Sequence, residues 1–298
     1  MTRGRRWQSA LFRLKHWLNA NSKRNAKRNV VAHYDLGNDF YRLWLDPTMT
    51  YSAALFGDNR AQPLQDAQNA KYTRILAELA LPPGAHILEI GCGWGGFAEV
   101  AGRAGYRVTG LSLSDAQTAY ARQRIALAGL ADRVAFRVQD YRDERGTYDG
   151  VASIEMFEAV GEAYWPAYFE TVRRVLAPGS RACIQTITIA DQRFQRYRTQ
   201  SDFIQRYIFP GGMLASPSRL LAEAARIDLV HERTHAFGGD YAETLARWLA
   251  AFDARANEVR AQGFGARFVR CWQFYLAYSI AGFLSESTDV AHYTLVAR

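Results

Sequence analysis

Apolar and polar positions along the chain follow two alternating periods. Short apolar runs predict strands, and longer stretches with one apolar face predict helices. The predicted strands are residues 86–90, 107–111, 134–138, 148–154, 181–187 and 292–297. The predicted helices are residues 64–81, 97–104, 115–127, 163–175, 217–226, 241–260 and 266–284. Because strands alternate with helices, we expect an α/β fold built on a doubly wound, mostly parallel sheet.

Residues 5–19 predict an amphipathic helix ahead of this pattern. On a wheel of 100° per residue, Phe12 breaks the pattern, but six other apolar residues fall within an arc of roughly 120°. These residues are Trp7, Ala10, Leu11, Leu14, Trp17 and Leu18. Basic residues occupy the opposite face, which is typical of a helix that binds an anionic membrane surface. The alternative is a helix that packs on its own domain and keeps its charged face in solvent.

The net charge of +8 comes from this N-terminal arm. Residues 1–32 hold nine Lys or Arg residues and no acidic residue, whereas the chain from His33 onward holds 28 basic and 29 acidic residues. A nucleic-acid-binding body needs basic residues spread over one face, so we expect no nucleic-acid partner.

The cysteine content also limits the function. Cys92, Cys183 and Cys271 are odd in number and far apart, which excludes a disulfide framework and a zinc set. We therefore expect a reducing, cytoplasmic compartment and no metal ion. No stretch approaches the ~20 apolar residues of a membrane span. The N-terminus also lacks the apolar run and cleavage site of a secretory signal.

A glycine-rich turn follows the first predicted strand. Its spacing is Gly91-x-Gly93-x-Gly95, and Glu89 precedes it. Glycines allow a backbone to approach a ligand closely between a strand and a helix. This spacing indicates an S-adenosylmethionine (SAM) site, with Glu89 near the ligand's ammonium group. A nicotinamide dinucleotide site is the poorer alternative, since its pattern is G-x-G-x-x-G.

The next two strands end in further candidate cofactor ligands. Ser112 and Gln117 follow the second strand and can bind a ribose diol through uncharged groups. Asp140 and Tyr141 follow the third strand and can meet an exocyclic amine and an adenine ring. Ligands of open α/β sheets bind at the carboxyl ends of strands, which supports all four positions.

Five longer runs together resemble the cyclopropane-fatty-acyl-phospholipid synthase family. They are residues 33–52, 90–96, 139–143, 156–161 and 202–212. The resemblance implies a class I methyltransferase (Rossmann-like) fold with seven strands. It also implies a methyltransferase domain at residues 31–298, with a substrate-covering helical insertion at about 190–285. The basic arm then comprises residues 1–30.

The resemblance implies a reaction as well. Family members transfer a methyl group from SAM to a cis double bond of a lipid acyl chain, and the carbocation loses a proton as the ring closes. An alkene is a weak nucleophile, so such a site must hold it against the sulfonium in a dry slot. Aromatic faces stabilise a cation that lacks a counter-charge.

The family's proton acceptor is a bound bicarbonate, and its ligands carry over to this sequence. They are Glu158, Gln185, Ile187 and Tyr241, with Ala53 as a further contact. Two positions depart from the family, which usually has Cys at position 53 and often His at position 185. Gln185 keeps a donor and an acceptor but cannot titrate.

The resemblance also implies a set of SAM ligands. They are Tyr51, Ser52, Gly91, Gly93, Ser112, Gln117, Asp140 and Tyr141, with His33 and Tyr34 closing the pocket.

Other readings of the function stay open from the sequence. The changed base site allows a methyl- or methylene-branched product, and the fold allows a non-lipid methyltransferase substrate. A non-catalytic lipid-binding relative is the alternative outside the enzyme class. The expected partners are a membrane phospholipid with an unsaturated acyl chain, the anionic inner face of the cell membrane, and a second copy of the chain in a homodimer.

Overall fold

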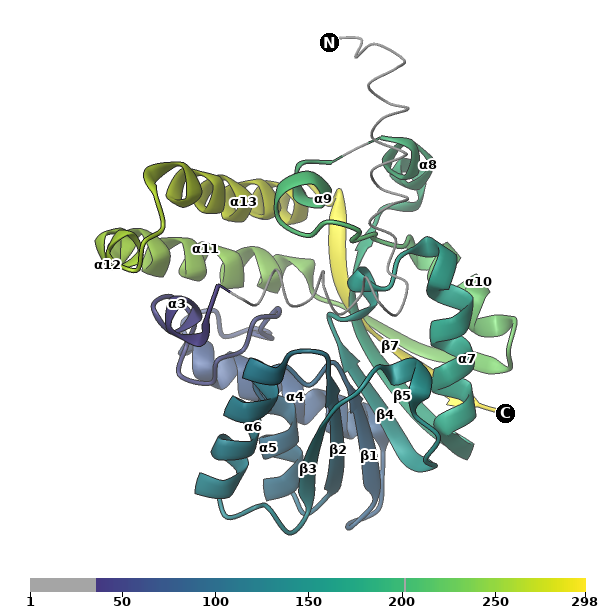
Figure 1. The fold of residues 1–298 in the computed structure, drawn as a ribbon. Coiled ribbons are helices and arrows are strands. Elements are labelled where there is room, and N and C mark those ends of the chain that lie inside the picture. Colours follow the sequence, from purple (N-terminus) through teal and green to yellow (C-terminus); the bar gives the residue numbers. More distant parts are fainter. Residues whose placement is uncertain (1–35, 201) are drawn as a thin grey trace.

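The computed structural model describes residues 36–200 and 202–298. Within these residues seven strands form one sheet in the order β3-β2-β1-β4-β5-β7-β6 (Figure 1). The strands are β1 (His86–Ile90), β2 (Arg107–Ser112), β3 (Val134–Val138), β4 (Tyr148–Ile154), β5 (Leu176–Ile189), β6 (Leu229–Ala236) and β7 (Thr288–Ala297). Strand β7 runs antiparallel to both neighbours, and the other pairs are parallel. The predicted doubly wound, mostly parallel seven-stranded sheet is confirmed.

Helices cover both faces of the sheet, as Figure 1 shows. One face carries α4 (Leu64–Leu79), α5 (Gly96–Arg103) and α6 (Asp115–Leu127). The other carries α7 (Trp165–Val175) and α10 (Pro217–Ala225). Both faces of the central strands are therefore buried, which explains their nearly continuous apolar sequences.

A second group of helices lies above the sheet in Figure 1. Its members are α3 (Asn38–Arg42), α8 (Asp191–Thr199), α9 (Phe203–Tyr207), α11 (Gly238–Ala254), α12 (Ala256–Ala261) and α13 (Ala266–Leu284). Helices α11 and α13 pack against each other along their length. Together these helices enclose the space beyond the carboxyl ends of the strands.

An aromatic cluster attaches α3 and the segment after it to α11 and α13. The ring of Phe40 lies 5.1 Å from that of Trp272, and the ring of Trp44 lies 5.7 Å from that of Trp248, both edge-on. All four side chains are buried. Each such pair contributes about 0.5–1.5 kcal/mol beyond burial of its area. The cluster fixes the segment that continues to Tyr51.

Two predicted elements differ from the structure. Strand β6 was missed, because its residues 231–234 are polar and exposed, and within residues 36–200 and 202–298 it pairs only with β7 at the edge of the sheet. The helix expected at 241–260 is two helices, α11 and α12, which meet at Arg255.

The predicted helical insertion at about 190–285 also needs correction. Strand β6 and helix α10 lie inside it and belong to the layers of the sheet. The helices above the sheet therefore come from two separate segments, α8–α9 and α11–α13.

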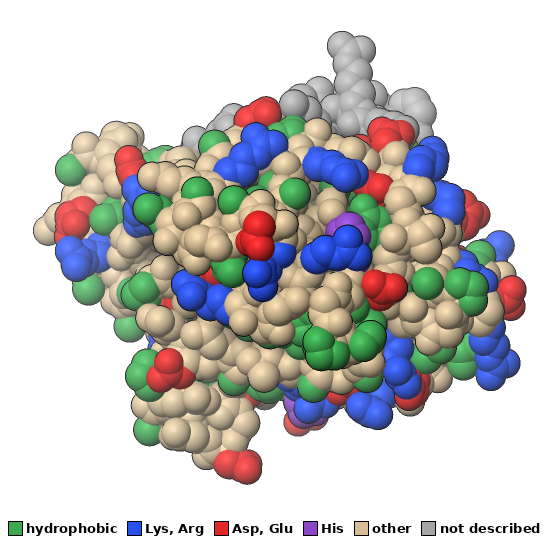
Figure 2. Space-filling view, turned by 90° about the horizontal axis from the view of Figure 1, so that it is seen from below, with side chains coloured by type: hydrophobic (Ala, Val, Ile, Leu, Met, Phe, Trp, Pro, Cys, Tyr) green, Lys and Arg blue, Asp and Glu red, His purple; other side chains and the backbone are tan. Residues whose placement is uncertain are grey.

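Charges on the described body are mixed. Figure 2 shows Lys and Arg side chains interspersed with Asp and Glu side chains over the face seen from below. The predicted amphipathic arm, residues 1–30, lies outside the described residues, as do His33 and Tyr34. Within the described chain, no helix is long and apolar enough to cross a membrane.

Candidate active site

The glycine turn after β1 borders a cavity at the carboxyl ends of β1 and β2. The N–H groups of Gly91 and Cys92 both donate to the carbonyl oxygen of Leu111 at 2.9 Å. Gly91 has a φ of 85°, and a Cβ there would lie 2.8 Å from the Met156 side chain. Backbone conformation and close approach therefore both require glycine at position 91. We call this space the glycine-turn cavity.

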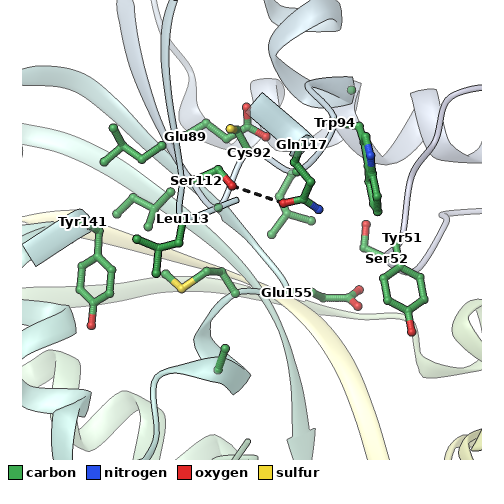
Figure 3. Close-up of a pocket in the computed structure, with 18 of the residues that line it drawn as sticks. Tyr51, Ser52, Glu89, Cys92, Trp94, Ser112, Leu113, Gln117, Tyr141 and Glu155 are labelled. Atoms are coloured by element: carbon green, nitrogen blue, oxygen red, sulfur yellow. Dashed lines mark hydrogen bonds between the residues drawn. The ribbon is translucent and has the colours of Figure 1, made fainter. Parts of the chain in front are cut away.

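Nine predicted SAM ligands line the glycine-turn cavity, and Figure 3 labels six of them. They are Tyr51, Ser52, Glu89, Gly91, Gly93, Ser112, Gln117, Asp140 and Tyr141. Gly95 does not line it. A Cβ on Gly95 would meet Ala121 and Phe136 at 3.1 Å, so this glycine allows the turn to pack closely against α6 and β3.

The predicted diol ligands lie side by side (Figure 3). The Ser112 hydroxyl donates to Gln117 Oε1 at 3.3 Å. Helix α6 begins just before Gln117, where Ser114 Oγ accepts the Gln117 N–H at 3.2 Å. This cap is worth about 1 kcal/mol and fixes the start of α6, while the bond from Ser112 orients the Gln117 side chain.

Asp140 lines the cavity but is already paired. Arg142 donates from Nε to Asp140 Oδ1 at 2.8 Å and from Nη2 to Oδ2 at 2.6 Å. Both side chains are nearly buried. Any ligand amine at this point shares the carboxylate with Arg142, which the sequence did not indicate.

Glu89 is the unsatisfied acid of this cavity. It is 2% exposed, and its Oε2 has no hydrogen-bond partner among the described residues. Burial raises its pKa to about 8, although the charges of Arg124 and Lys71 act in the opposite direction. A buried carboxyl facing a cavity suits a cationic ligand group.

A second, larger cavity of about 610 Å³ adjoins the first. Residues of α8, α9, α11 and α13 line it, together with Ile187 and Ile189 of β5. Three residues line both cavities: Tyr51, Glu155 and Ala159. The side chains of Tyr51 and Glu155 approach the same region in Figure 3. The two cavities therefore meet at these residues.

Glu155 receives three hydrogen bonds at this junction. Its Oε1 accepts from the Ala53 N–H at 2.7 Å and from Gln185 Nε2 at 2.7 Å. Its Oε2 accepts from the Tyr241 hydroxyl at 2.6 Å. The three donors come from separate parts of the chain and converge on one carboxyl group. Glu155 is not among the site residues predicted from the sequence.

Glu158 lies in a different environment. Its Oε1 accepts from the Ile187 N–H at 2.5 Å and from the Thr186 hydroxyl at 2.9 Å. Its Oε2 is buried without a partner among the described residues. Burial raises the pKa of Glu158, and the charge of Glu155 raises it further. Glu158 is therefore the carboxyl of the pair that holds a proton more readily.

The residues present do not fit the bicarbonate that the resemblance implies. Of the predicted cradle, the groups of Ala53, Gln185 and Tyr241 donate to Glu155, and Ile187 donates to Glu158. These donors are thus engaged by protein carboxyls. A further anion here would also face two acidic side chains.

Lys71 is a buried cation beside this carboxyl pair. Its side chain is fully buried, and its Nζ donates to Ser52 Oγ at 2.5 Å and to Gln68 Oε1 at 2.7 Å. Burial lowers the pKa of Lys71, and the nearby charge of Glu155 counteracts this. Burial likewise raises the pKa of Glu155, and the charge of Lys71 offsets part of that rise. Lys71 and Glu155 therefore each favour the charged form of the other.

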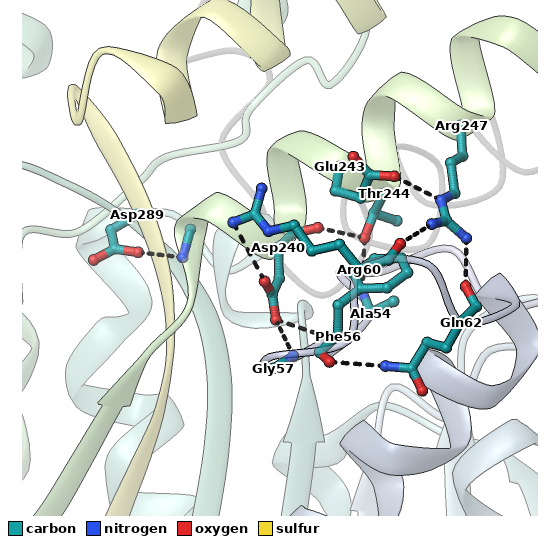
Figure 4. Close-up of polar contacts among 11 residues, drawn as sticks. Ala54, Phe56, Gly57, Arg60, Gln62, Asp240, Glu243, Thr244, Arg247 and Asp289 are labelled. Carbon is teal, nitrogen blue, oxygen red and sulfur yellow. Dashed lines mark hydrogen bonds and ion pairs between the residues drawn. The ribbon is translucent and has the colours of Figure 1, made fainter.

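A polar network holds the two sides of the junction together (Figure 4). Asp240 Oδ2, at the start of α11, accepts from the N–H groups of Phe56 and Gly57 at 2.8 and 3.0 Å. Thr244 Oγ1 accepts from the Ala54 N–H at 3.1 Å. These bonds fix the loop after Ala53 to the helix that carries Tyr241.

Comparison with known proteins identifies the family. A family model described as mycolic acid cyclopropane synthetase matches residues 21–293. The chain belongs to this family. The resemblance inferred from the sequence is therefore confirmed, and so is the class I methyltransferase fold.

Two curated relatives match over most of the chain. It is 41% identical over 287 residues to the tuberculostearic acid methyltransferase UfaA1 of Mycobacterium tuberculosis. It is 38% identical over 259 residues to the cyclopropane-fatty-acyl-phospholipid synthase of Escherichia coli. The matches cover 92% and 87% of this chain but only 66% and 65% of those proteins. The chain thus spans about two thirds of their length.

A solved structure shares the fold closely. The mycolic acid cyclopropane synthase CmaA1, in complex with SAH and CTAB, superposes with a TM-score of 0.84 at 30% identity. The match covers 91% of this chain and 98% of that chain.

Glu155 and Lys71 are the residues that sequence reasoning missed. Glu155 follows directly on the apolar strand β4, and the carboxyl end of a parallel strand is a recognised site position. That position was a usable signal. Lys71 lies on α4 and reads as an ordinary surface lysine, so the sequence offered no signal for it.

Proposed function

We propose that the protein transfers the methyl group of SAM to the cis double bond of an unsaturated phospholipid acyl chain. The resulting carbocation then loses a proton as a cyclopropane ring closes. The junction of the two cavities at Tyr51, Glu155 and Ala159 carries this proposal. A methyl group can pass from one cavity to the other only where they meet.

The glycine-turn cavity suits SAM. Glu89 offers the ammonium group a carboxyl oxygen that has no partner among the described residues, and Ser112 and Gln117 offer polar groups to the ribose. Gly91 brings backbone close to the ligand without a side chain. When bound, SAM would supply the methyl group as an electrophile attached to a sulfonium. The relative of known structure complexed with SAH supports this assignment.

The second cavity suits an acyl chain. Leu245, Phe283 and Ile187 give it apolar walls, and its size falls within the range of ligand sites. Such walls exclude water from an alkene that reacts slowly. The rings of Tyr51, Tyr241 and Tyr275 lie around the junction, where aromatic faces can stabilise a carbocation.

The rim of the second cavity suits a lipid surface. Phe274 and Tyr278 of α13 and Tyr207 of α9 are exposed large aromatics, and Tyr278 also lines the cavity. Arg193 and Arg196 of α8 are exposed and line it as well. Aromatic and basic side chains together favour the interface of an anionic membrane. This supports a phospholipid substrate and a peripheral location at the inner face of the membrane.

The test is expression in cells that contain cis-monounsaturated phospholipids, followed by mass spectrometry of their fatty acids. We expect new acyl chains heavier by one methylene group, with NMR signals of a cyclopropane ring. The empty vector and the Glu162→Gln variant serve as controls, since Glu162 pairs with Arg198 and lines neither cavity. An unchanged lipid profile would refute the proposal.

A methyl- or methylene-branched product is the second candidate. Ala53, Gln185 and Glu155 give the junction a base site that differs from the one the family resemblance implies. The relative at 41% identity is named as a methyltransferase for tuberculostearic acid, which favours the same reading. A 1,2-hydride shift moves the positive charge of the same carbocation onto the methylated carbon, and loss of a proton from the transferred methyl group then gives the methylene-branched chain. A saturated methyl branch requires a further hydride donor that reduces this alkene. Gas chromatography of the modified chains distinguishes the two outcomes.

The remaining expectations stay predictions. They are the membrane-binding role of the arm at residues 1–30, the domain at 31–298 and a homodimer. Loss of liposome binding on deletion of the arm and the mass in solution test the first and the last.

A further inference from the structure

We propose that Glu155 is the proton acceptor of the reaction, in place of a bound bicarbonate. The inference rests on the proposed function, because it concerns the carbocation that methyl transfer creates. It adds a residue of this chain that touches the reacting atoms.

The hydrogen-bond donors around Glu155 support this role. The Ala53 N–H, Gln185 Nε2 and the Tyr241 hydroxyl all lie 2.6–2.7 Å from the Glu155 carboxylate. The family resemblance assigns these same three positions to bicarbonate. Bicarbonate and a carboxylate present the same planar pair of oxygens, so donors arranged for one also suit the other. Here the pair of oxygens belongs to the chain.

The Glu155 carboxyl also lies where the reaction would take place. Glu155 lines the glycine-turn cavity and the second cavity at once. The carbocation forms where these cavities meet, so its acidic C–H bonds come within reach of Glu155. Glu158 lines only the second cavity and does not share this position.

The backbone conformation of Glu155 is also typical of a functional residue. Glu155 has a φ of 48°, in the left-handed region that non-glycine residues rarely adopt. Such a conformation costs of order 1–3 kcal/mol and is typical of functional sites. Its N–H donates to the Gln185 carbonyl oxygen at 2.8 Å, which holds the strained residue against β5.

The surrounding charges are consistent with an ionised Glu155. Three hydrogen bonds donated to a carboxyl favour its charged form. Burial raises the pKa of both acids, but Lys71 and the three donated hydrogen bonds counteract this at Glu155. At Glu158 the charge of Glu155 adds to the effect of burial, and one carboxyl oxygen has no partner among the described residues. When two neighbouring acids have different environments, one holds the proton and the other stays a base. In this pair Glu155 is the base.

The proton transfer balances without another reactant. The carbocation carries its charge on the carbon next to the newly methylated carbon. A C–H bond of the transferred methyl group breaks, and its electron pair forms the last C–C bond of the ring. The proton passes to a Glu155 oxygen, which becomes a neutral carboxylic acid and later returns the proton to water. Loss of a proton from an adjacent chain carbon would instead give an alkene.

The first test uses the wild-type protein alone. Lipid methylation is measured with unsaturated phospholipid vesicles and SAM, in buffer freed of carbon dioxide and in the same buffer with added bicarbonate. We expect equal rates. A rate that falls on removal of carbon dioxide and returns with bicarbonate overturns the inference while leaving the proposed function intact. A wild-type protein that makes no product in either buffer refutes the proposed function itself, and the inference with it.

The second test uses two variants of Glu155. Glu155→Gln keeps the shape and the acceptor oxygen, and Glu155→Gly removes the side chain at a φ that glycine tolerates. Loss of a general base lowers kcat by about 10²–10⁴-fold. We expect this loss in both variants, with SAM affinity and melting temperature close to wild type. The Glu162→Gln variant is the matched control and should keep the wild-type rate.

Rescue separates a base from a structural residue. Formate or bicarbonate can enter the space left in Glu155→Gly and should restore activity there, but not in Glu155→Gln. Full activity of Glu155→Gln overturns the inference. So does a folded, SAM-binding Glu155→Gly variant that no small anion rescues.

Discussion

Glu89 allows a quantitative prediction about cofactor binding. Its carboxyl is 2% exposed and faces the glycine-turn cavity, and no residue in the described part of the chain hydrogen-bonds to its Oε2. Burial raises its pKa to about 8. At pH 7, about nine in ten Glu89 carboxyls are therefore protonated before any ligand binds.

The ammonium group of SAM favours the ionised carboxylate and returns its pKa toward the ordinary value. Binding at pH 7 should therefore release close to one proton. Because binding releases a proton, the affinity for SAM rises with pH, by about tenfold between pH 6 and pH 7. It becomes constant above the pKa of Glu89 in the unliganded protein. Below pH 7 the ligand's own amine stays charged and does not contribute.

Titration calorimetry in two buffers of different ionisation enthalpy measures the released proton directly. Wild-type protein should show a binding enthalpy that depends on the buffer. The Glu89→Gln variant should lose most of this dependence, and Glu162→Gln should keep it. Equal enthalpies in both buffers for the wild type, or an unchanged dependence in Glu89→Gln, would refute the reasoning.

Two further predictions concern the residues around Glu155. Lys71→Met removes the buried amine whose charge lowers the pKa of Glu155, so the acid limb of the pH–rate profile should move to higher pH. Tyr241 and Glu158 also titrate beside the Glu155 carboxyl. An acid limb that stays in place would contradict the electrostatic coupling of Lys71 and Glu155. Asp240→Ala removes two hydrogen bonds to a charged acceptor, so the free energy of unfolding should fall by about 2–4 kcal/mol and kcat should fall more than SAM affinity. Asp240→Asn keeps an acceptor oxygen and should recover part of both, as thermal melts and steady-state rates can measure.

Much of the fold could be predicted because its central strands are buried on both faces. Strands β1 and β4 are apolar runs that end at glycine or charged residues, so their limits follow from the sequence. Strand β6 could not be found in this way. It is an edge strand, and its exposed residues carry no apolar pattern. The division of α11 from α12 at Arg255 likewise has no proline or glycine to mark it.

Part of the candidate site could also be predicted from local sequence, and part could not. The glycine turn, Ser112, Gln117 and Tyr141 lie close to strand ends, so local sequence was enough to predict that they would gather at one cavity. The role of Glu155 depends on three contacts from residues 30 to 102 positions away. No local pattern encodes that convergence, which appears only when the sheet, the loop at Ala53 and α11 are assembled.

The contacts of Glu155 account for the two departures from the family pattern, Ala53 and Gln185. Ala53 contributes its backbone N–H to the Glu155 carboxylate and needs no side-chain donor for that purpose. Gln185 donates its amide to the same carboxylate and accepts from His292 Nε2 at 2.9 Å, so each end of its amide has a partner. If the acid–base group is part of the chain, neither position needs a titratable or reactive side chain. The changes at positions 53 and 185 are then consistent with one altered base site and need not indicate loss of catalysis.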